Sequence, residues 1–367
     1  MGVTRTREGI LSLASVDDYL GPADSRFFGS GYRRVGYAFR DAGSFGRTTG
    51  STQVRARFRI DYPTDWSVKT GDVELRPHLS TVDVLMLAVR AAMSCAARAF
   101  ELVDHDQFRI WPRQVDVRAG TAPVEDGLDD VEVRAALRTT VPHPDAPHRR
   151  VSAFDCQVGV MTARVELDHP AGRAKAADST GTADSTGTAG TENTADRRWD
   201  ELLGSSDPGP YGSGYRHRWP TVEQIIANVP AARADAMARM SQAPQPVPQV
   251  PPPRAGRQPA SACHPPVSMI DSFVVALQLG QILLYEMDGL TRTDSNTLWM
   301  RHTRVSAPGH GRPATGPASS AGPFAAAVSL SNSRLVTGRD AHRWRTASID
   351  GTCDGVAVRC AVAHRLP

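Results

Sequence analysis

Two long segments of apolar residues follow helical spacing and predict buried helices. The first runs from about Thr81 to Leu102, and the second from about Met269 to Met287. Within the first, apolar side chains recur at steps of three and four residues, which places them on one helix face. Polar residues are so few on the other faces of both segments that each helix is expected to be buried nearly all round.

Other segments alternate between polar and apolar residues, which is typical of strands with one face against a core. The pattern is found in "TQVRARFRIDY" from Thr52, "VEVRAALRTTV" from Val131, "VGVMTARVEL" from Val158, "LWMRHTRVSA" from Leu298 and "GVAVRCAVAH" from Gly355. Each half of the chain combines one long helix with several antiparallel strands, so the predicted fold class is α+β.

The two halves also resemble each other in the same order. "LGPADSRFFGSGYRR" from Leu20 returns as "LGSSDPGPYGSGYRH" from Leu203, and one constant offset aligns the stretch from Ser80 with the stretch from Ser268 without a gap. A weaker third likeness joins residues 154–169 to residues 349–364. Such repeats indicate an internal duplication. We expect a tandem, double hotdog-like fold, in which two units share one sheet and the active site lies where they meet.

Low-complexity segments set the expected domain boundaries. Residues 174–198 have no apolar residue larger than alanine and cannot bury a core. A Pro-rich segment interrupts the second half and is expected to be extended. The predicted organisation is a first hotdog-like repeat at 15–172, a disordered linker at 173–199, and a second repeat at 200–367 with a Pro-rich insertion at 242–266.

Composition excludes several classes of protein. The net charge of +3 is too small to favour nucleic acid as a partner. Five cysteines at scattered spacing form neither a disulfide framework nor a zinc motif, and no phosphate-binding or dinucleotide fingerprint occurs, so neither metal nor cofactor is expected. The N-terminus lacks the apolar segment of a signal peptide, and the longest apolar run, Phe273 to Leu284, contains two glutamines. We therefore expect a cytoplasmic protein that does not span a membrane.

Both predicted helices begin with a Ser-x-x-Asp pattern, at Ser80 and Asp83 and again at Ser268 and Asp271. The pattern is that of a capping box, and helix capping is one sufficient explanation of these residues. The alternative gives Asp271 a catalytic role as a base, with the free N–H groups of the helix start holding an oxyanion. His264 precedes the second helix and is the second catalytic candidate.

Polar residues distinguish the second helix from the first. Gln278, Gln281 and Tyr285 form a stripe in an otherwise apolar segment. Buried amides need partners, so the stripe either bonds to neighbouring strands or lines the polar end of a substrate pocket. On the following strand, Trp299 and Arg301 share one face. They either pack there as a structural pair, or they bind a phosphate or carboxylate.

The segments "SVDDYLGPADSRFFGSGYRRV" from Ser15 and "VSMIDSFVVALQLGQILLYEMDG" from Val267 resemble the avirulence protein D (AvrD) family. The resemblance covers most of the chain outside the linkers. It implies an enzyme that joins a β-ketoacyl thioester to a ketopentose in making syringolide-type glycolipids. The paired helices are also similar to those of the A-factor (γ-butyrolactone) synthases, and this similarity implies a hotdog-like fold with a functional glutamine, matched here by Gln278 or Gln281.

The predicted function is that of an acyltransferase that joins a β-ketoacyl thioester to a sugar-like or triose hydroxyl acceptor. Asp271 and His264 are the expected catalytic residues, and Gln278, Gln281, Tyr285, Trp299 and Arg301 the expected substrate-binding residues. The expected partners are an acyl-CoA or acyl carrier protein thioester and a small acceptor, with a homodimer left open. A thioesterase, a dehydratase that pairs His264 with Asp83, and a non-catalytic ligand-binding protein remain as alternatives.

Overall fold

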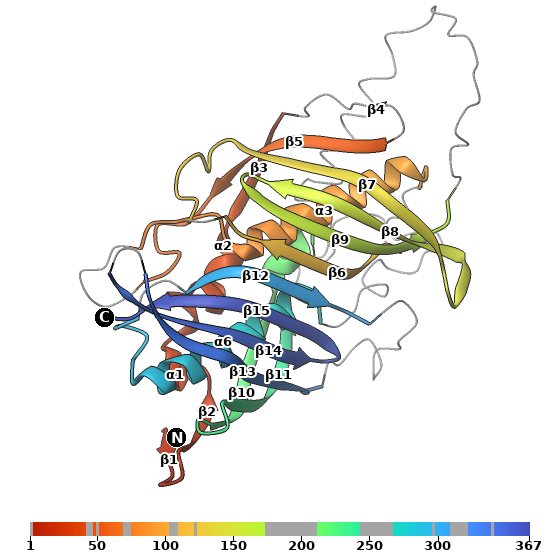
Figure 1. The fold of residues 1–367 in the computed structure, drawn as a ribbon. Coiled ribbons are helices and arrows are strands. Elements are labelled where there is room, and N and C mark those ends of the chain that lie inside the picture. Colours follow the sequence, from red (N-terminus) through yellow and green to blue (C-terminus); the bar gives the residue numbers. More distant parts are fainter. Residues whose placement is uncertain are drawn as a thin grey trace, which may run out of the picture.

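The computed structural model describes residues 3–41, 47–48, 51–68, 75–102, 109–120, 123–172, 211–242, 267–295, 298–308, 322–338 and 341–367 (Figure 1). The predicted linker at 173–199 and nearly all of the predicted Pro-rich insertion at 242–266 lie outside these residues. The helical elements are α1 (Asp17–Leu20), η1 (Ala23–Ser25), η2 (Phe27–Gly31), α2 (Tyr32–Arg34), α3 (Thr81–Ala99), η3 (Ser213–His217) and α6 (Met269–Asp288).

A single antiparallel sheet dominates the fold. Its strands are β1 (Thr4–Arg5), β2 (Ile10–Ser15), β3 (Gly36–Asp41), β4 (Arg47–Thr48), β5 (Ser51–Asp61), β6 (Trp111–Arg118), β7 (Val131–His143), β8 (Ala146–Val158), β9 (Met161–Pro170), β10 (Arg218–Asn228), β11 (Arg233–Gln242), β12 (Trp299–Ser306), β13 (Phe324–Thr337), β14 (Arg343–Cys353) and β15 (Val356–Arg365). The order is β1-β2-β10-β11-β13-β14-β15-β12-β6-β9-β8-β7-β5-β3, with β4 beside β5. The α+β class and the alternating strands predicted from the sequence are confirmed.

The two halves of the chain contribute adjoining parts of this sheet and meet at the antiparallel pair β6–β12. At this seam Asp116 faces Arg304, and the Arg304 Nε donates to Asp116 Oδ2 at 2.8 Å. The same offset that aligns Ser80 with Ser268 also aligns Asp116 with Arg304. The seam therefore places residues from matching positions of the two halves directly opposite each other.

Both long helices begin as their sequences predict. The Ser80 hydroxyl accepts from the Asp83 N–H, and the Asp83 carboxylate accepts from the Ser80 N–H at 2.7 Å. Ser268 and Asp271 form the same reciprocal pair at the start of α6. The capping box is therefore confirmed at both helices, since each end satisfies two backbone donors that would otherwise be unpaired.

α6 packs closely against the strands of its own half of the sheet (Figure 1). A Cβ built on Gly280 would lie 2.6 Å from Ile349 Cδ1, so β14 can approach the helix only because this residue has no side chain. By length and composition α6 could cross a membrane, but 89% of its most apolar window is buried inside the protein. The core helix of a globular domain is buried to a similar extent.

Segments of the N-terminal half reach into the C-terminal half. β2 pairs with β10, and the Phe28 ring of η2 packs edge-on against Phe273 of α6 with ring centroids 6.2 Å apart. In the opposite direction, the ring centroids of Tyr215 in η3 and Tyr37 in β3 are 6.5 Å apart. The Tyr215 hydroxyl also donates to the Val35 carbonyl. The two Gly-Ser-Gly-Tyr-Arg segments thus pack against elements of the other half of the chain.

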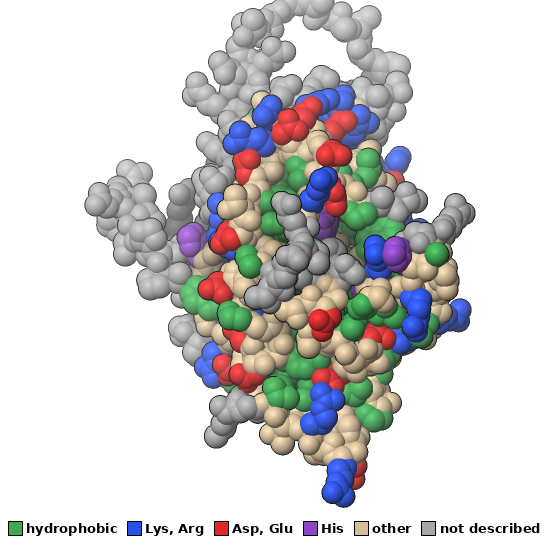
Figure 2. Space-filling model, turned by 90° about the vertical axis from the view of Figure 1, so that its left-hand side faces the viewer, with side chains coloured by type: hydrophobic (Ala, Val, Ile, Leu, Met, Phe, Trp, Pro, Cys, Tyr) green, Lys and Arg blue, Asp and Glu red, His purple; other side chains and the backbone are tan. Residues whose placement is uncertain are grey.

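On the face shown in Figure 2, basic and acidic side chains lie next to one another instead of forming separate fields. Several exposed arginines have carboxylate partners on the same or a neighbouring strand, as in the pairs Arg134–Glu132 and Arg233–Asp235. Interspersed charges of both signs leave no extended single-signed field on that face.

Candidate functional site

A cavity of about 80 Å³ lies where the two halves of the chain meet. Gln281 and Tyr285 of α6 contribute one part of its lining, and His78 and Ser80 at the start of α3 contribute another. The other lining residues are Arg26, Phe27, Phe28, Trp66, Ser67, Leu75, Arg292, Leu298 and Met300. The helix start of one half therefore faces the polar stripe of the other.

The two α6 residues of this lining are linked to each other and to Ser295, which follows the helix and is not part of the lining. The Gln281 amide nitrogen donates to the Tyr285 hydroxyl at 3.5 Å, and the Ser295 hydroxyl donates to the same oxygen at 3.0 Å. Burial raises the pKa of the Tyr285 phenol, which keeps it protonated. The Gln281 carbonyl oxygen has no partner among the described residues and can accept a hydrogen bond from a bound hydroxyl group.

A histidine with a defined tautomer lies near the start of α3. The His78 Nδ1 lies 3.3 Å from the Arg76 carbonyl, and a carbonyl can only accept, so Nδ1 carries the proton. In the neutral imidazole with this tautomer, Nε2 carries the lone pair. The ring also packs edge-on against Trp66 at a centroid distance of 5.6 Å, which fixes its plane. This imidazole can act as a general base.

Behind Ser80, Asp83 is completely buried in a ring of hydroxyl groups. The Tyr37 hydroxyl donates to Asp83 Oδ1 at 2.7 Å, and the Ser80 hydroxyl donates to Oδ2 at 2.7 Å. Burial raises the pKa of Asp83, although hydrogen bonds from Tyr62, Tyr37 and Ser80 oppose the rise.

The Tyr62 hydroxyl contacts both Asp83 and a backbone carbonyl. The Tyr62 hydroxyl lies 2.6 Å from the His78 carbonyl and also contacts Asp83 Oδ2. One hydroxyl has a single proton, and the carbonyl can only accept. Tyr62 therefore shares its proton between the Asp83 carboxyl group and the His78 carbonyl. The tyrosine connects the start of α3 to the backbone of His78.

Asp271, the matching carboxylate of α6, lies in different surroundings. Arg218 Nη2 is 3.4 Å from its Oδ2, and neither residue is part of the cavity lining. Ten residues of helix at about 1.5 Å per residue separate Asp271 from Gln281, or roughly 15 Å. The structure therefore does not bring Asp271 together with the Gln281 and Tyr285 pair. His264, its expected partner, lies outside the described residues.

The other predicted substrate residues, Gln278, Trp299 and Arg301, do not line the cavity. Leu298 and Met300 line the cavity, whereas their neighbours Trp299 and Arg301 lie outside its lining. There the Arg301 guanidinium lies over the Trp299 ring at 6.0 Å. Gln278 lies behind the cavity, where it accepts from Arg26 Nη1 at 2.6 Å and donates weakly to the Val274 carbonyl at 3.4 Å.

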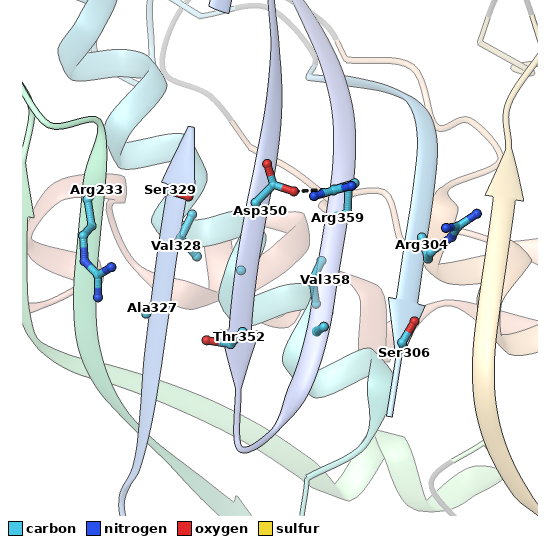
Figure 3. A pocket seen from close by; sticks show the side chains of 12 residues that line it. Arg233, Arg304, Ser306, Ala327, Val328, Ser329, Asp350, Thr352, Val358 and Arg359 are labelled. Atoms are coloured by element: carbon cyan, nitrogen blue, oxygen red, sulfur yellow. Dashed lines mark hydrogen bonds and ion pairs between the residues drawn. The ribbon is translucent and has the colours of Figure 1, made fainter. Parts of the chain in front are cut away.

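A larger groove, of about 450 Å³, lies on the outer face of the sheet over strands β11 to β15. Figure 3 shows that its arginines do not converge: Arg359 points toward Asp350, and Arg304 points away toward β6. Arg304 also binds Asp116, and Arg233 binds Asp235. Because each of these cations has a carboxylate partner, the groove has no concentrated charge for a ligand.

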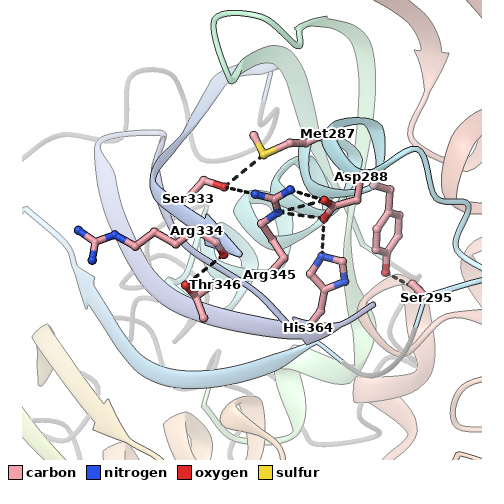
Figure 4. Close-up of polar contacts among 9 residues, drawn as sticks. Met287, Asp288, Ser295, Ser333, Arg334, Arg345, Thr346 and His364 are labelled. Carbon is pink, nitrogen blue, oxygen red and sulfur yellow. Dashed lines mark hydrogen bonds and ion pairs between the residues drawn. The ribbon is translucent and has the colours of Figure 1, made fainter. Parts of the chain in front are cut away.

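Asp288 at the end of α6 is the centre of a buried polar cluster (Figure 4). Its carboxylate accepts from Arg345 Nε at 3.0 Å and from His364 Nε2 at 2.9 Å. The His364 Nδ1 is buried and has no partner in the part of the chain that the structure describes, and burial lowers the pKa of this imidazole. In the first half His169, which the sequence aligns with His364, bonds through both ring nitrogens. The cluster ties β14 and β15 to the helix and does not line the cavity.

Among the described residues, no group of three His, Cys, Asp or Glu side chains is placed to hold a metal ion. The cavity itself offers arginine, amide, hydroxyl and imidazole groups. These groups can bind an oxygen-rich substrate, stabilise a developing negative charge and move a proton.

A family model described as Pseudomonas avirulence D protein (AvrD) matches residues 11–367. The chain belongs to the AvrD family. The resemblance seen in the sequence is confirmed, and the match extends over both halves of this AvrD-family chain. No curated protein matches the sequence.

Several solved structures resemble the AvrD-family chain. A conserved protein of unknown function with a hotdog fold from Alicyclobacillus acidocaldarius is 13% identical, with a TM-score of 0.35 over 89% of this chain and 97% of that one. A dehydratase studied for the borrelidin and fluvirucin polyketide synthases is 12% identical, with a TM-score of 0.30 over 90% and 97%. The acyl-CoA thioesterase II of Mycobacterium marinum is 12% identical, with a TM-score of 0.29 over 78% and 89%.

Proposed function

We propose that this protein is an acyltransferase that joins a β-ketoacyl thioester to a hydroxyl group of a sugar-like acceptor. The observation that carries the proposal is the meeting of Gln281 and Tyr285 with His78 and Ser80 in one cavity between the two halves. Membership of the AvrD family supports it, because the family resemblance implies this class of product. In our proposal the two halves arose by duplication. Of the two helix starts, that of α3 shares the cavity with Gln281 and Tyr285, whereas that of α6 faces Arg218.

The reaction proceeds by attack of the acceptor hydroxyl on the thioester carbonyl. His78 Nε2 takes the proton of the hydroxyl, and the first N–H groups of α3 hold the negative charge that develops on the carbonyl oxygen. The C–S bond then breaks, and the thiolate leaves with the proton from His78. An ester and a free thiol result. Condensation of the ester with the acceptor ketone, with loss of water, closes a butenolide ring on or off the enzyme.

The acceptor is held by the α6 wall. The Gln281 carbonyl oxygen and the Tyr285 hydroxyl offer an acceptor and a donor to neighbouring hydroxyl groups of a small polyol. The cavity is small beside the roughly 300 Å³ of ordinary ligand pockets. It therefore suits the small polar end of a substrate, with the rest of the bound molecules, including the acyl chain, extending beyond it. We place the reaction in the cytoplasm, where acyl-CoA and acyl carrier protein thioesters are available.

The test is to incubate the pure full-length protein with a β-ketoacyl-CoA or carrier-protein thioester and a ketose, and to follow products by mass spectrometry. The expected product is an ester or butenolide that contains both substrates. Free acid alone, with every acceptor, would make the protein a thioesterase. An enoyl product from a β-hydroxyacyl thioester would make it a dehydratase. Tight binding without turnover would make it a ligand-binding protein.

Two histidine variants connect the activity to the cavity. His78→Gln should lower the rate roughly 100-fold or more, the usual contribution of a general base. His302→Gln is the matched control, because His302 binds Asp116 at the seam of the sheet, on β12, and is absent from the cavity lining. Equal rates for the two variants would remove His78 from the reaction.

A further inference from the structure

The cavity has an unusual charge balance. Arg26 and Arg292 both line it, and none of its described lining residues is an aspartate or glutamate. Each arginine is a permanent cation with up to five N–H donors. Two such groups beside one small cavity need a compensating charge, because partly buried cations are costly unless they are paired.

The first of the two cations is already partly compensated. Arg26 is 4% exposed, and its Nη2 binds the Asp17 carboxylate, while Nη1 donates to Gln278. The Asp17 side chain is 44% exposed, so solvent screens its charge. Arg26 is thus a paired cation, and among the described residues that line the cavity the cation without a carboxylate partner is Arg292.

The second cation has only neutral partners. Arg292 Nη2 donates to the carbonyls of Ser25 and Val68 at 2.8 and 2.9 Å. Its Nε and Nη1 have no partner among the described residues, and no carboxylate there forms an ion pair with it. Burial lowers the pKa of both guanidinium groups, and the charge of Arg292 adds to the effect on Arg26, which shows that the two cations repel each other.

Building on the proposed acyltransferase, we infer that this cavity binds a phosphate monoester carried by one of its substrates. Two guanidinium groups from separate elements, together with the Gln281 amide and the Ser67 hydroxyl, offer enough donors for three terminal oxygens. A dianion cancels the repulsion between Arg26 and Arg292, and a single carboxylate would leave several donors unused. The volume of about 80 Å³ fits a group of this size and excludes an acyl chain.

The phosphate has two chemical sources, and each is tested with the whole protein. In one arm, calorimetry compares a ketose phosphate with the free ketose. In the other, it compares CoA with pantetheine, which lacks every phosphate. At least tenfold tighter binding of the phosphorylated member is expected in one arm, and that arm identifies the source. Equal binding within both pairs would overturn the inference, as would acetate that binds as tightly as inorganic phosphate.

Variants locate the phosphate. Arg292→Gln should abolish the tenfold preference, while Arg359→Gln, on the outer face of the sheet, should leave it unchanged. An unchanged preference in folded Arg292→Gln would contradict the inference. Should Arg292→Gln fail to fold, Arg292→Lys, which keeps the charge without the planar fork, should retain only part of the preference, and full retention would contradict the inference.

The phosphate inference and the proposed acyltransferase activity are contradicted by different results. A phosphate preference without any product would leave the inference standing and would contradict the acyltransferase. Product made equally well from a neutral ketose and a pantetheine thioester would support the acyltransferase and contradict the phosphate inference.

Discussion

Arg26 Nη1 donates to Gln278 Oε1 at 2.6 Å, and this buried hydrogen bond joins a segment near the N-terminus to the middle of α6. Gln278 is 2% exposed and Arg26 is 4% exposed. The bond therefore holds η2 and the cavity against the helix of the other half. Of the three polar residues on α6, Gln278 therefore has a structural role, whereas Gln281 and Tyr285 line the cavity.

Replacement of Gln278 by leucine should destabilise the protein, even though leucine matches the apolar surroundings of α6. Gln278→Leu leaves a charged N–H of Arg26 buried without its acceptor, which costs about 1–3 kcal/mol. Urea denaturation should show a lower midpoint with an unchanged slope. Leu277→Met on the same helix is the control, because it conserves volume and polarity and should cost less than about 1.5 kcal/mol. Equal stability of Gln278→Leu and wild type would show that the bond contributes nothing.

The two capping aspartates should differ in how pH affects them. The folded pKa of Asp83 is raised, so the folded state binds more protons than the unfolded state at pH values above about 3.9. Its contribution to stability is therefore largest at low pH and falls as pH rises toward the folded pKa. The destabilisation by Asp83→Asn should shrink from pH 3.5 to pH 7.

Asp271→Asn provides the control for this experiment. It removes a carboxylate from the same position of an equivalent capping box, but one that faces Arg218 and lacks the two tyrosines. Chemical denaturation of both variants across this range tests the difference. A destabilisation by Asp83→Asn that grows with pH would mean that Asp83 is ionised in the folded protein.

His169 makes the folded protein sensitive to acid. Burial lowers its pKa to about 4, and its two ring nitrogens already bond to Ser152 and to the Pro170 carbonyl in the neutral form. Because the folded pKa is below the unfolded value of about 6.5, the stability that depends on neutral His169 is lost as pH falls below about 6.5. The loss between pH 7 and pH 4 is roughly 3 kcal/mol.

His169→Gln should remove most of this dependence while keeping a donor and an acceptor at the site. Denaturation midpoints of wild type and variant between pH 7 and pH 4 give the comparison. Parallel pH profiles would show that His169 does not titrate in this range.

Gly280 tests the close packing of α6 on the sheet. Gly280→Ala introduces a Cβ at 2.6 Å from Ile349 Cδ1, and overpacking of this kind costs about 1–3 kcal/mol despite the better helix propensity of alanine. The double variant Gly280→Ala with Ile349→Val removes the clashing methyl group and should recover part of the loss. Melting temperatures of Gly280→Ala, Ile349→Val and the double variant give the coupling. A stabilised Gly280→Ala would contradict the packing described here.

The helices were predictable because their signals are local. The boxes at Ser80 and Ser268 and the apolar spacing fix where α3 and α6 begin, and the alternation of β5, β7, β9, β12 and β15 fixes their inward faces. The stripe on α6 also marked Gln281 and Tyr285, which line the cavity.

The rest of the cavity could not be predicted because it depends on which segments cross between the halves. His78 and Arg292 read as ordinary loop residues, and no local pattern shows that η2 packs against α6. One sequence-level signal was available: a helix rises about 1.5 Å per residue, so Asp271 and Gln281 of one helix cannot share a small pocket. That geometry favours a helix start from the other half, and α3 provides it.

The central claim is that chemistry takes place between the start of α3 and the polar stripe of α6. A crystal structure of the protein with an unreactive β-ketoacyl thioester analogue and the acceptor tests it directly. We predict that the thioester carbonyl lies within hydrogen-bonding reach of the first N–H groups of α3 and close to His78, with the acceptor against Gln281 and Tyr285. A carbonyl bound instead at the start of α6, beside Asp271 and Arg218, would contradict the account.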